Sequence, residues 1–94
     1  MKKAIVIGGG IGGLSIAARL LNDGFNVHLY EKNKSLGGKI NCLKHDNFKF
    51  DLTGSILMIP KDYIEIFNYC NKNYKDYFSL IPLNDLYKVF YYDN

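Results

Sequence analysis

A cluster of glycines near the N-terminus constrains the fold more than any other feature of the sequence. The pattern Gly8-x-Gly10-x-x-Gly13 follows residues 4–7, a short apolar run rich in β-branched side chains. Such a run is typical of a strand covered on both faces. After the glycines, apolar residues recur at helical spacing as far as Leu21. A strand, a glycine turn and a helix in this order predict the start of a dinucleotide-binding β-α-β unit.

A second strand and an acidic residue complete this unit. Gly24 is placed to end the helix, and residues 26–30 alternate as a strand does before Glu31. Glu31 follows Gly13 at close to the spacing of about 20 residues that separates the glycine motif from a ribose-binding acid. We therefore expect Glu31 to accept hydrogen bonds from the adenosine ribose hydroxyls. In that position it would repel the 2′-phosphate of NADP.

Each glycine of the motif has a predicted role. Gly8 makes the tight turn from strand to helix, Gly10 lets the main chain approach the diphosphate, and Gly13 allows the helix to pack closely on the strand. The N–H groups of Ile11, Gly12 and Gly13, at the helix N-terminus, are expected to face the phosphates. A glycine turn in an α/β domain that binds no nucleotide is the alternative.

A second glycine pair separates FAD from NAD, which present the same ADP half to such a unit. Glu31 and Lys32 are followed by Gly37-Gly38 and then by the basic residue Lys39. This spacing resembles the second signature of FAD-dependent amine-oxidase-like flavoproteins. The two glycines would let another stretch of main chain approach the cofactor, and Lys39 would offset the charge of the diphosphate. A simple surface loop is the alternative; we predict FAD.

Beyond residue 39 we expect a hairpin, an amphipathic helix and a terminal strand. Residues 40–43 and 48–52 are strand candidates separated by the turn signal Asp46-Asn47. Pro60 opens a helix, and residues 86–92 carry the β-branched and aromatic residues of a strand. One face of the helix would hold Tyr63, Ile66, Phe67, Cys70 and Tyr74. The predicted fold class is α/β: a Rossmann-like FAD-binding β-α-β unit followed by these elements, forming an incomplete domain.

Composition and spacing argue against several other classes of protein. The net charge is only +3, and the basic residues are interleaved with acids, so no nucleic-acid-binding stripe is predicted. Cys42 and Cys70 lack disulfide-framework and zinc-site spacing, and we expect both to be reduced and buried. His28 and His45 have no second ligand at metal spacing, so no metal site is predicted. Neither a signal peptide nor a membrane-spanning stretch is found, which predicts a cytoplasmic location.

Six stretches of the sequence carry a family resemblance. They are residues 6–14, 30–33, 37–39, 48–51, 56–60 and 70–77. Together they resemble the N-terminal part of the phytoene desaturase-type carotenoid desaturases, most closely the bacterial dehydrosqualene (diapophytoene) desaturases. The resemblance implies a Rossmann-like FAD domain with a discontinuous substrate domain, which oxidises an apolar polyene precursor by hydride transfer to the flavin. In a full-length enzyme it also implies peripheral contact with a membrane.

Two positions depart from the family pattern. Lys39 stands where the family often has arginine, and Asp51-Leu52-Thr53-Gly54-Ser55 replaces Asp-x-Gly-Pro-Ser/Thr. Thr53 places a β-branched side chain where the family's main chain passes the flavin, and it would be strained at a positive φ. The roles of Asp51 and Ser55 stay unassigned.

Family members are several times longer than this chain, so we expect an N-terminal portion of the FAD domain. Residues 1–39 would form the dinucleotide-binding unit, and residues 40–94 the partial hairpin, the helix and the start of the substrate-domain strands. Such a chain would keep the ADP-binding half of the site without a competent active site. The alternatives are one half of a split flavoenzyme, completed by a separately encoded remainder, and a small NAD- or ADP-binding scaffold without redox activity.

No catalytic residue is predicted. The predicted cofactor-binding residues are Gly8, Gly10, Ile11, Gly12, Gly13, Glu31, Lys32, Gly37, Gly38 and Lys39.

Overall fold

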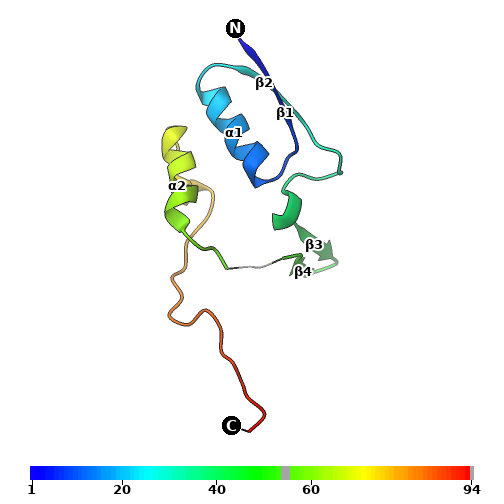
Figure 1. The fold of residues 1–94 in the computed structure, drawn as a ribbon, viewed down its shortest axis with the longest axis vertical. Coiled ribbons are helices and arrows are strands. Elements are labelled where there is room, and N and C mark those ends of the chain that lie inside the picture. Colours follow the sequence, from blue (N-terminus) through cyan, green and yellow to red (C-terminus); the bar gives the residue numbers. More distant parts are fainter. Residues whose placement is uncertain (54–55, 94) are drawn as a thin grey trace.

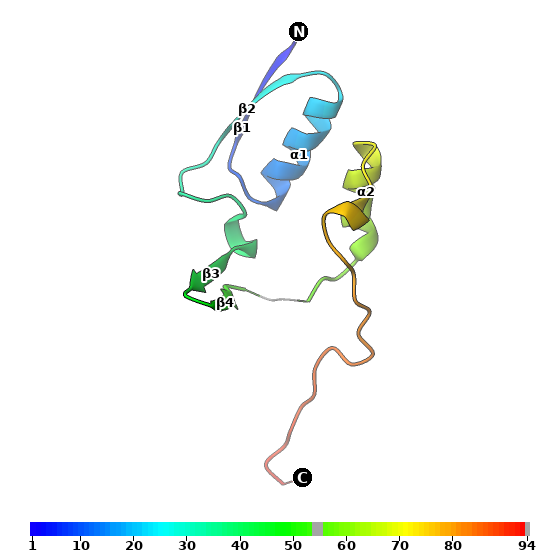
Figure 2. The same ribbon diagram turned by 180° about the vertical axis from the view of Figure 1, so that it is seen from behind.

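A computed structural model describes residues 1–53 and 56–93 of the chain. In chain order the elements are β1 (Lys3–Ile7), α1 (Ile11–Asn22), β2 (Asn26–Tyr30), the 3₁₀ helix η1 (Gly38–Ile40), β3 (Cys42–His45), β4 (Phe48–Asp51), α2 (Pro60–Tyr69) and the 3₁₀ helix η2 (Tyr74–Asp76). In Figure 1, α1 lies against the β1–β2 pair, α2 stands beside α1, and the β3–β4 hairpin lies below them. Figure 2 shows from behind that the C-terminal segment leads away from all of these elements.

The β-α-β unit is present as predicted. β1 and β2 pair in parallel from Lys3 opposite Asn26 to Ile7 opposite Tyr30, with α1 as the connection between them. Parallel strands place their carboxyl ends at the same edge of the sheet, which is where such folds bind ligands. The glycine turn after β1 and Glu31 after β2 therefore lie side by side.

α1 ends where the sequence predicts, just before Gly24. Gly24 adopts a φ of +90°, in the left-handed region that glycine enters without strain. The N–H groups of Gly24 and Phe25 donate to the carbonyls of Leu21 and Leu20, at 3.1 and 3.0 Å. These bonds satisfy carbonyls of the last helical turn and direct the chain back into β2.

The predicted hairpin forms, with its first strand shifted by two residues and its second strand ending one residue earlier, at Asp51. β3 pairs antiparallel with β4, and Asp46 takes a φ of +52° at the turn between them. Ile40, which was expected in the first strand, lies instead in η1 because its N–H donates to the carbonyl of Gly37 at 3.1 Å. The positive φ of Gly37, +117°, opens this turn and delays the strand until Cys42.

The predicted strand at residues 86–92 does not form. In the described part of the C-terminal segment, residues 79–93 contain neither helix nor strand. Phe90 is 88% exposed there. Strand propensity measures how well a side chain fits a pleated, half-buried surface, and a strand needs a neighbour to pair with. No described strand lies beside this segment, so its aromatic and β-branched residues remain extended in solvent.

The core is small, and one face of the sheet is uncovered. Among the described hydrophobic residues only Val6 and Ala17 are buried, where β1 meets α1. On the opposite face of the sheet Ile5, Ile7 and Tyr30 are 68%, 87% and 59% exposed. The radius of gyration is 17.2 Å, against about 12 Å for a compact chain of this length. The β-α-β unit therefore packs on one side only.

Polar contacts join the C-terminal ends of α1 and α2. The Tyr69 hydroxyl donates to the Asp23 carboxylate, with oxygen–oxygen distances of 2.9 and 2.8 Å. The Asn22 amide donates to the Tyr69 carbonyl at 3.1 Å, and the Arg19 guanidinium lies 4.7 Å from the centre of the Tyr69 ring. The hydrogen bond to Asp23 raises the pKa of Tyr69, because ionisation of the phenol would lose that bond. Tyr69 thus fixes the position of α2 against α1.

Both cysteines are free thiols and only half-buried, so the prediction that they are buried is wrong. Cys70 follows α2, and its thiol lies 3.6 Å from the Ala18 carbonyl, where α2 meets α1. Next to it, Phe67 packs against Tyr77 and Phe78 with ring centres 5.1 and 5.5 Å apart. This aromatic contact gives α2 a small packing cluster of its own.

Replacing Tyr69 with phenylalanine should loosen the contact between the two helices. Tyr69→Phe keeps the ring over Arg19 and removes only the hydroxyl that binds Asp23. We expect the free energy of unfolding to fall by about 1 kcal/mol, measured by urea denaturation. Tyr87→Phe is the matched control because Tyr87 is 78% exposed in the extended C-terminal segment. An equal effect of the two substitutions would contradict the assignment of Tyr69.

Candidate functional site

The glycine turn has the close contacts that the motif predicts. Gly8 adopts a φ of +103°, and its N–H donates to the Tyr30 carbonyl at 2.8 Å, which ties the turn to the end of β2. A Cβ atom on Gly13 would collide with the carbonyl oxygen of Gly8. The Gly8 oxygen belongs to the main chain and a Cβ is held rigidly on its own main chain, so neither atom can move aside. Only glycine at position 13 allows α1 to start this close to β1.

The N-terminus of α1 is open for an anion. Gly10 is the N-cap residue and offers no side-chain hydrogen bond, and the first turn of α1 holds no acid. The first N–H groups of a helix, here those of Ile11, Gly12 and Gly13, have no partner within the helix. A Cβ placed on Gly10 or Gly12 would meet no atom within 4 Å. Free donors, the positive end of the helix dipole and open space fit a diphosphate here.

The Glu31 carboxylate binds the main chain on both of its oxygens. Oε1 accepts from the Gly9 N–H at 3.0 Å, and Oε2 accepts from the Asn33 N–H at 2.7 Å. The bond from Asn33, followed by the bond from Gly9, lowers the pKa of Glu31. Because a carboxylate oxygen has two lone pairs, these bonds leave acceptor capacity for a ligand. The predicted contact of Glu31 with ribose stays a prediction, now with a fixed orientation of the carboxylate.

The two glycine loops meet at Gly9 and Gly10. The N–H of Gly37 donates to the Gly9 carbonyl at 2.8 Å. A Cβ on Gly38 would lie 3.2 Å from the Gly10 Cα. Gly37 and Gly38 have φ values of +117° and +58°, which suit glycine. The second glycine pair is therefore packed against the first motif, which disfavours the simple surface loop.

Gly9 is a site residue that the sequence motif does not single out. It is buried, and both of its main-chain polar groups are used, the N–H by Glu31 and the carbonyl by Gly37. A Cβ on Gly9 would come within 2.5 Å of the Leu36 side chain. The motif treats this position as a spacer, so the available signal was only the unbroken run of three glycines.

Lys32 and Lys39 are exposed at opposite ends of the second loop. Lys32 follows Glu31 directly, and its charge contributes to lowering the Glu31 pKa. Lys39 lies in η1 next to the glycine pair, and its carbonyl accepts a 2.6 Å hydrogen bond from the Thr53 hydroxyl. The ten predicted residues thus gather around the start of α1, with the two lysines at the rim.

Thr53 does not carry the strain that its replacement of a family glycine suggested. The described non-glycine residues with positive φ are Asp46, Ile59 and Asn71. The Thr53 hydroxyl instead connects the end of β4 to η1 through the Lys39 carbonyl. Asp51 is the exposed last residue of β4, while Ser55 lies outside the described residues.

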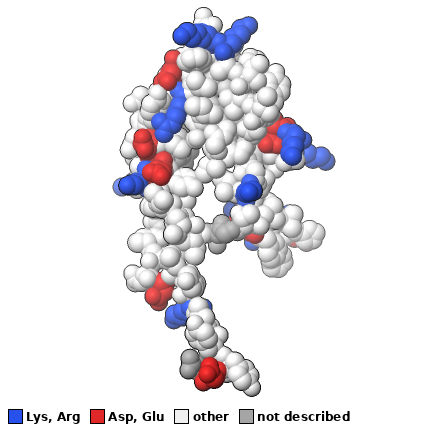
Figure 3. All heavy atoms as spheres, in the orientation of Figure 1, with Lys and Arg blue, Asp and Glu red and all other residues white. Residues whose placement is uncertain are grey.

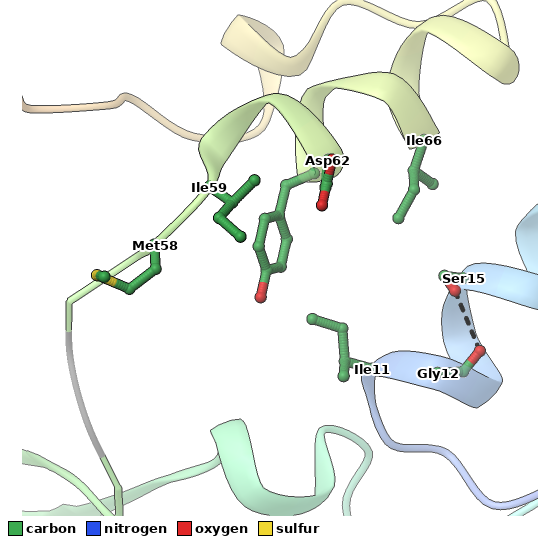
Figure 4. Close-up of a pocket in the computed structure, with 8 residues that line it drawn as sticks. Ile11, Gly12, Ser15, Met58, Ile59, Asp62 and Ile66 are labelled. Carbon is green, nitrogen blue, oxygen red and sulfur yellow. Dashed lines mark hydrogen bonds between the residues drawn. The ribbon is translucent and has the colours of Figure 1, made fainter.

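Two cavities adjoin the start of α1 and the hairpin. One, of about 320 Å³, lies between α1 and the start of α2, and Figure 4 shows Ile11, Ile59 and Ile66 pointing toward it. The other, of about 230 Å³, is lined by Asn41, Thr53 and neighbouring residues. Tyr63 lines both. The first is within the size range of pockets that hold small molecules, about 300–1,000 Å³. Space therefore continues from the helix N-terminus toward the hairpin.

Charged side chains are mixed over the visible surface. Figure 3 shows lysine and arginine interspersed with aspartate and glutamate on the face drawn. Each described helix is too short or too polar to cross a membrane.

A parallel β-α-β unit with a glycine turn, an open helix N-terminus and an acid after β2 defines a dinucleotide-binding Rossmann-like fold. The chain belongs to the family of NAD(P)-binding Rossmann-like domains, whose pattern matches residues 6–72. The predicted α/β fold class is thereby confirmed.

Individual relatives confirm the resemblance to carotenoid desaturases. The 4,4′-diapophytoene desaturase (4,4′-diaponeurosporene-forming) of Staphylococcus aureus strain MRSA252 is 44% identical over 89 residues, covering 95% of this chain and 18% of the relative. The 4,4′-diaponeurosporene oxygenase of Staphylococcus haemolyticus strain JCSC1435 is 50% identical over 84 residues, covering 87% of this chain and 17% of the relative. The chain thus spans less than a fifth of the length of these curated relatives.

A solved structure shows the same arrangement. The crystal structure of reduced UDP-galactopyranose mutase superposes with a TM-score of 0.52 and 40% sequence identity. The match covers 60% of this chain and 12% of the mutase chain. The likeness again concerns a limited part of a longer protein.

Alanine substitutions at Gly12 and Gly13 should distinguish the effect of close packing on stability from the effect of helix propensity. Gly13→Ala brings a Cβ into the Gly8 carbonyl, and we expect a loss of at least about 2 kcal/mol of stability. Gly12→Ala is the control, since its Cβ meets nothing within 4 Å and helix propensity favours it by up to about 1 kcal/mol. Thermal unfolding followed by circular dichroism measures both. Equal stability of the two variants would refute the packing role of Gly13.

Acid should weaken the fold through Glu31. Because main-chain donors lower its pKa from the ordinary value of 4.5, the ionised carboxylate stabilises the folded chain above pH 4.5. This contribution is lost as the pH falls through the lowered pKa of the folded state. We expect Glu31→Gln to be less stable than the unsubstituted chain near pH 7, with the difference shrinking below pH 4.5.

Urea midpoints measured from about pH 3 to about pH 7 follow this difference. The control is Glu65→Gln, since Glu65 is exposed on α2. A difference between Glu31→Gln and the unsubstituted chain that stays constant across the range would show that the carboxylate does not act through its ionised form.

Proposed function

We propose that this chain forms the ADP-binding part of an FAD site in a flavoprotein of the carotenoid-desaturase type. The contact between the two glycine loops carries the proposal. The Gly37 N–H binds the Gly9 carbonyl, and Gly38 packs on Gly10. A β-α-β unit for NAD needs only the first loop, whereas the second loop resembles a flavoprotein signature. The desaturase and the oxygenase named above support the same assignment.

The first motif would hold the diphosphate. Gly10 leaves space for it, and the N–H groups of Ile11, Gly12 and Gly13 donate to its oxygens. Gly8 and Gly13 let the turn close without a side chain in the way. A lysine or arginine is not needed at this point, because the positive end of the helix dipole faces the phosphates.

The adenosine ribose would lie at Glu31, with the second loop over the diphosphate. The Glu31 oxygens keep lone pairs for the ribose hydroxyls. Gly37 and Gly38 bring a second main chain close to Gly10. The exposed lysines, Lys32 and Lys39, would lower the electrostatic cost of binding a dianionic group. When bound, the flavin supplies the hydride acceptor of the reaction.

The flavin half would leave the diphosphate on the side opposite Glu31. A dinucleotide has two halves joined at the diphosphate, so adenosine at Glu31 directs the other half past Ile11 and Gly12. The larger of the two cavities begins there, and Tyr63 lines both it and the second cavity. Both are open to solvent in this chain, so we infer that the flavin half gains little from residues 1–94 by themselves.

The activity of a complete protein would then resemble that of the desaturases. We infer an apolar polyene as substrate, such as dehydrosqualene or phytoene, oxidised by hydride transfer to the flavin. Residues 1–39 would be the dinucleotide-binding unit and residues 40–94 the start of the region that continues toward the substrate. The uncovered sheet face would be packed by polypeptide equivalent to the part of the relatives that this chain does not match, whether continuous with it or separately encoded.

We also infer that a complete protein works in the cytoplasm and touches a membrane peripherally, where an apolar polyene resides. Co-expression with the polypeptide encoded directly downstream would test a separately encoded remainder. A flavin-reducing pair would support it, and a remainder that never co-purifies would exclude it.

Calorimetric titration with ADP, FAD, NAD and NADP tests the proposal. We expect ADP and FAD to bind with similar, weak affinity, because only the ADP half meets a formed site. NADP should bind at least about tenfold more weakly because Glu31 repels its 2′-phosphate. Glu31→Gln should reduce this discrimination, whereas the exposed-surface control Glu65→Gln should not.

Three results would count against the proposal. A preference for NAD over FAD would favour the small nucleotide-binding scaffold. No binding of ADP would remove the site altogether. A stoichiometric yellow flavoprotein with desaturase turnover would show that residues 1–94 form a complete site.

A further inference from the structure

The second glycine loop lacks regular structure between Glu31 and η1, yet it is held in one position. Its two glycines sit at positive φ, +117° for Gly37 and +58° for Gly38. One main-chain hydrogen bond, from Gly37 to Gly9, joins it to the first loop. Because this is a single bond, the approach of Gly38 to Gly10 also depends on the contacts that hold the loop on the side facing away from Gly9.

Asn41 lies on that other side. Its amide nitrogen Nδ2 donates to the Ser35 hydroxyl at 2.7 Å and to the Leu36 carbonyl at 3.2 Å. Its oxygen Oδ1 accepts from the N–H of Cys42 at 2.9 Å. One half-buried side chain thus connects Ser35 and Leu36, which precede the glycine pair, to the first residue of β3.

Asn41 also lies directly against Gly37. A Cβ on Gly37 would have three atoms of Asn41 between 3.8 and 3.9 Å away. The asparagine therefore packs on the residue that binds Gly9, while its amide holds the two residues before it. An amide carries both donors and an acceptor. It can therefore donate to the Leu36 carbonyl and accept from the Cys42 N–H, whereas a carboxylate has no donor and an aliphatic side chain has neither.

We propose that Asn41 is a positioning residue for the dinucleotide site, holding the Gly37–Gly38 main chain against the first glycine loop. The proposal rests on the proposed function, because the place where Gly38 approaches Gly10 is where the diphosphate would cross. Asn41 also lines the smaller cavity, but the role proposed here concerns the loop and not a contact with the ligand. It acts through the loop, which it keeps ordered before the ligand arrives, so the ligand does not have to order it.

Two measurements on one set of variants test this role. The first is amide hydrogen exchange by NMR in the ligand-free chain, comparing Gly37, whose N–H binds Gly9, with Gly8, whose N–H binds Tyr30. Asn41→Ala should speed exchange at Gly37 by about tenfold and leave Gly8 nearly unchanged. A general loss of stability would instead speed exchange at both glycines alike.

The second measurement is the affinity for ADP by calorimetry. Asn41→Ala should weaken ADP binding by about five- to tenfold. Ser35→Ala removes one acceptor of the same amide and should give a smaller change in both measurements, and the double variant should not exceed Asn41→Ala by the full effect of Ser35→Ala. Alanine avoids adding a negative charge beside the diphosphate.

Asn22→Ala is the matched control. The Asn22 amide also donates to a carbonyl, that of Tyr69, but at the far end of α1. It should change neither the Gly37 exchange rate nor the ADP affinity by more than its effect on global stability. Thermal unfolding of each variant supplies that correction.

Failure of this inference and failure of the proposed function give different results. If the unsubstituted chain does not bind ADP, both the proposed function and the positioning role of Asn41 are refuted. If it binds ADP and Asn41→Ala binds equally well, only the role of Asn41 is refuted. Equal acceleration of exchange at Gly37 and Gly8 would likewise reduce Asn41 to a general stabilising residue.

Discussion

The main chain of Gly9 is the point on which the site depends. Its N–H meets the Glu31 carboxylate, and its carbonyl meets the Gly37 N–H. Three segments that are separate in sequence, the turn after β1, the end of β2 and the second glycine loop, are joined at this single residue. Because Gly9 is buried, each of these polar groups needs its partner, and losing one would leave an unsatisfied group. The geometry of the binding edge follows from that requirement.

One side of the site is well packed, whereas the other side is open to solvent. The side of the site at Glu31 and the start of α1 has helix donors, an oriented carboxylate and two packed loops. The opposite side has cavities open to solvent, an uncovered sheet face and an extended C-terminal segment. This division matches the comparisons, in which the chain aligns with less than a fifth of the desaturase and of the oxygenase. The dinucleotide-binding motif is therefore local, whereas the described residues leave its surroundings open to solvent.

Local patterns predicted the β-α-β unit well because each signal acts over a few residues. An apolar run, glycines at fixed offsets and helical periodicity specified β1, the turn and α1 without knowledge of the rest. Likewise Asp46-Asn47 marked the hairpin turn. The strand expected at 86–92 was wrong for the opposite reason, since a strand exists only through its neighbours and none of the described strands borders that segment.

The contacts that shape the site could not be predicted in the same way. Gly9 contributes only main-chain groups, which no side-chain pattern reveals. The Asn41 amide bridges a loop whose path depends on two glycines at positive φ. Glu31 was found by its spacing, but its bonds to Gly9 and Asn33 depend on how closely the turn approaches β2. Sequence offsets identify which residues gather, whereas their orientation depends on packing.

The two buried side chains of the core, Val6 and Ala17, have a thermodynamic consequence for any ligand of this fold. A protein with so little buried apolar area has a small intrinsic margin of stability. A ligand that binds only the folded state adds RT ln(1 + [L]/Kd), about 2.7 kcal/mol at a hundred times Kd. In such a chain that term is comparable to the whole margin. For residues 1–94 by themselves, a dinucleotide at the proposed site would act as part of the core, and its concentration would set how much of the chain is folded.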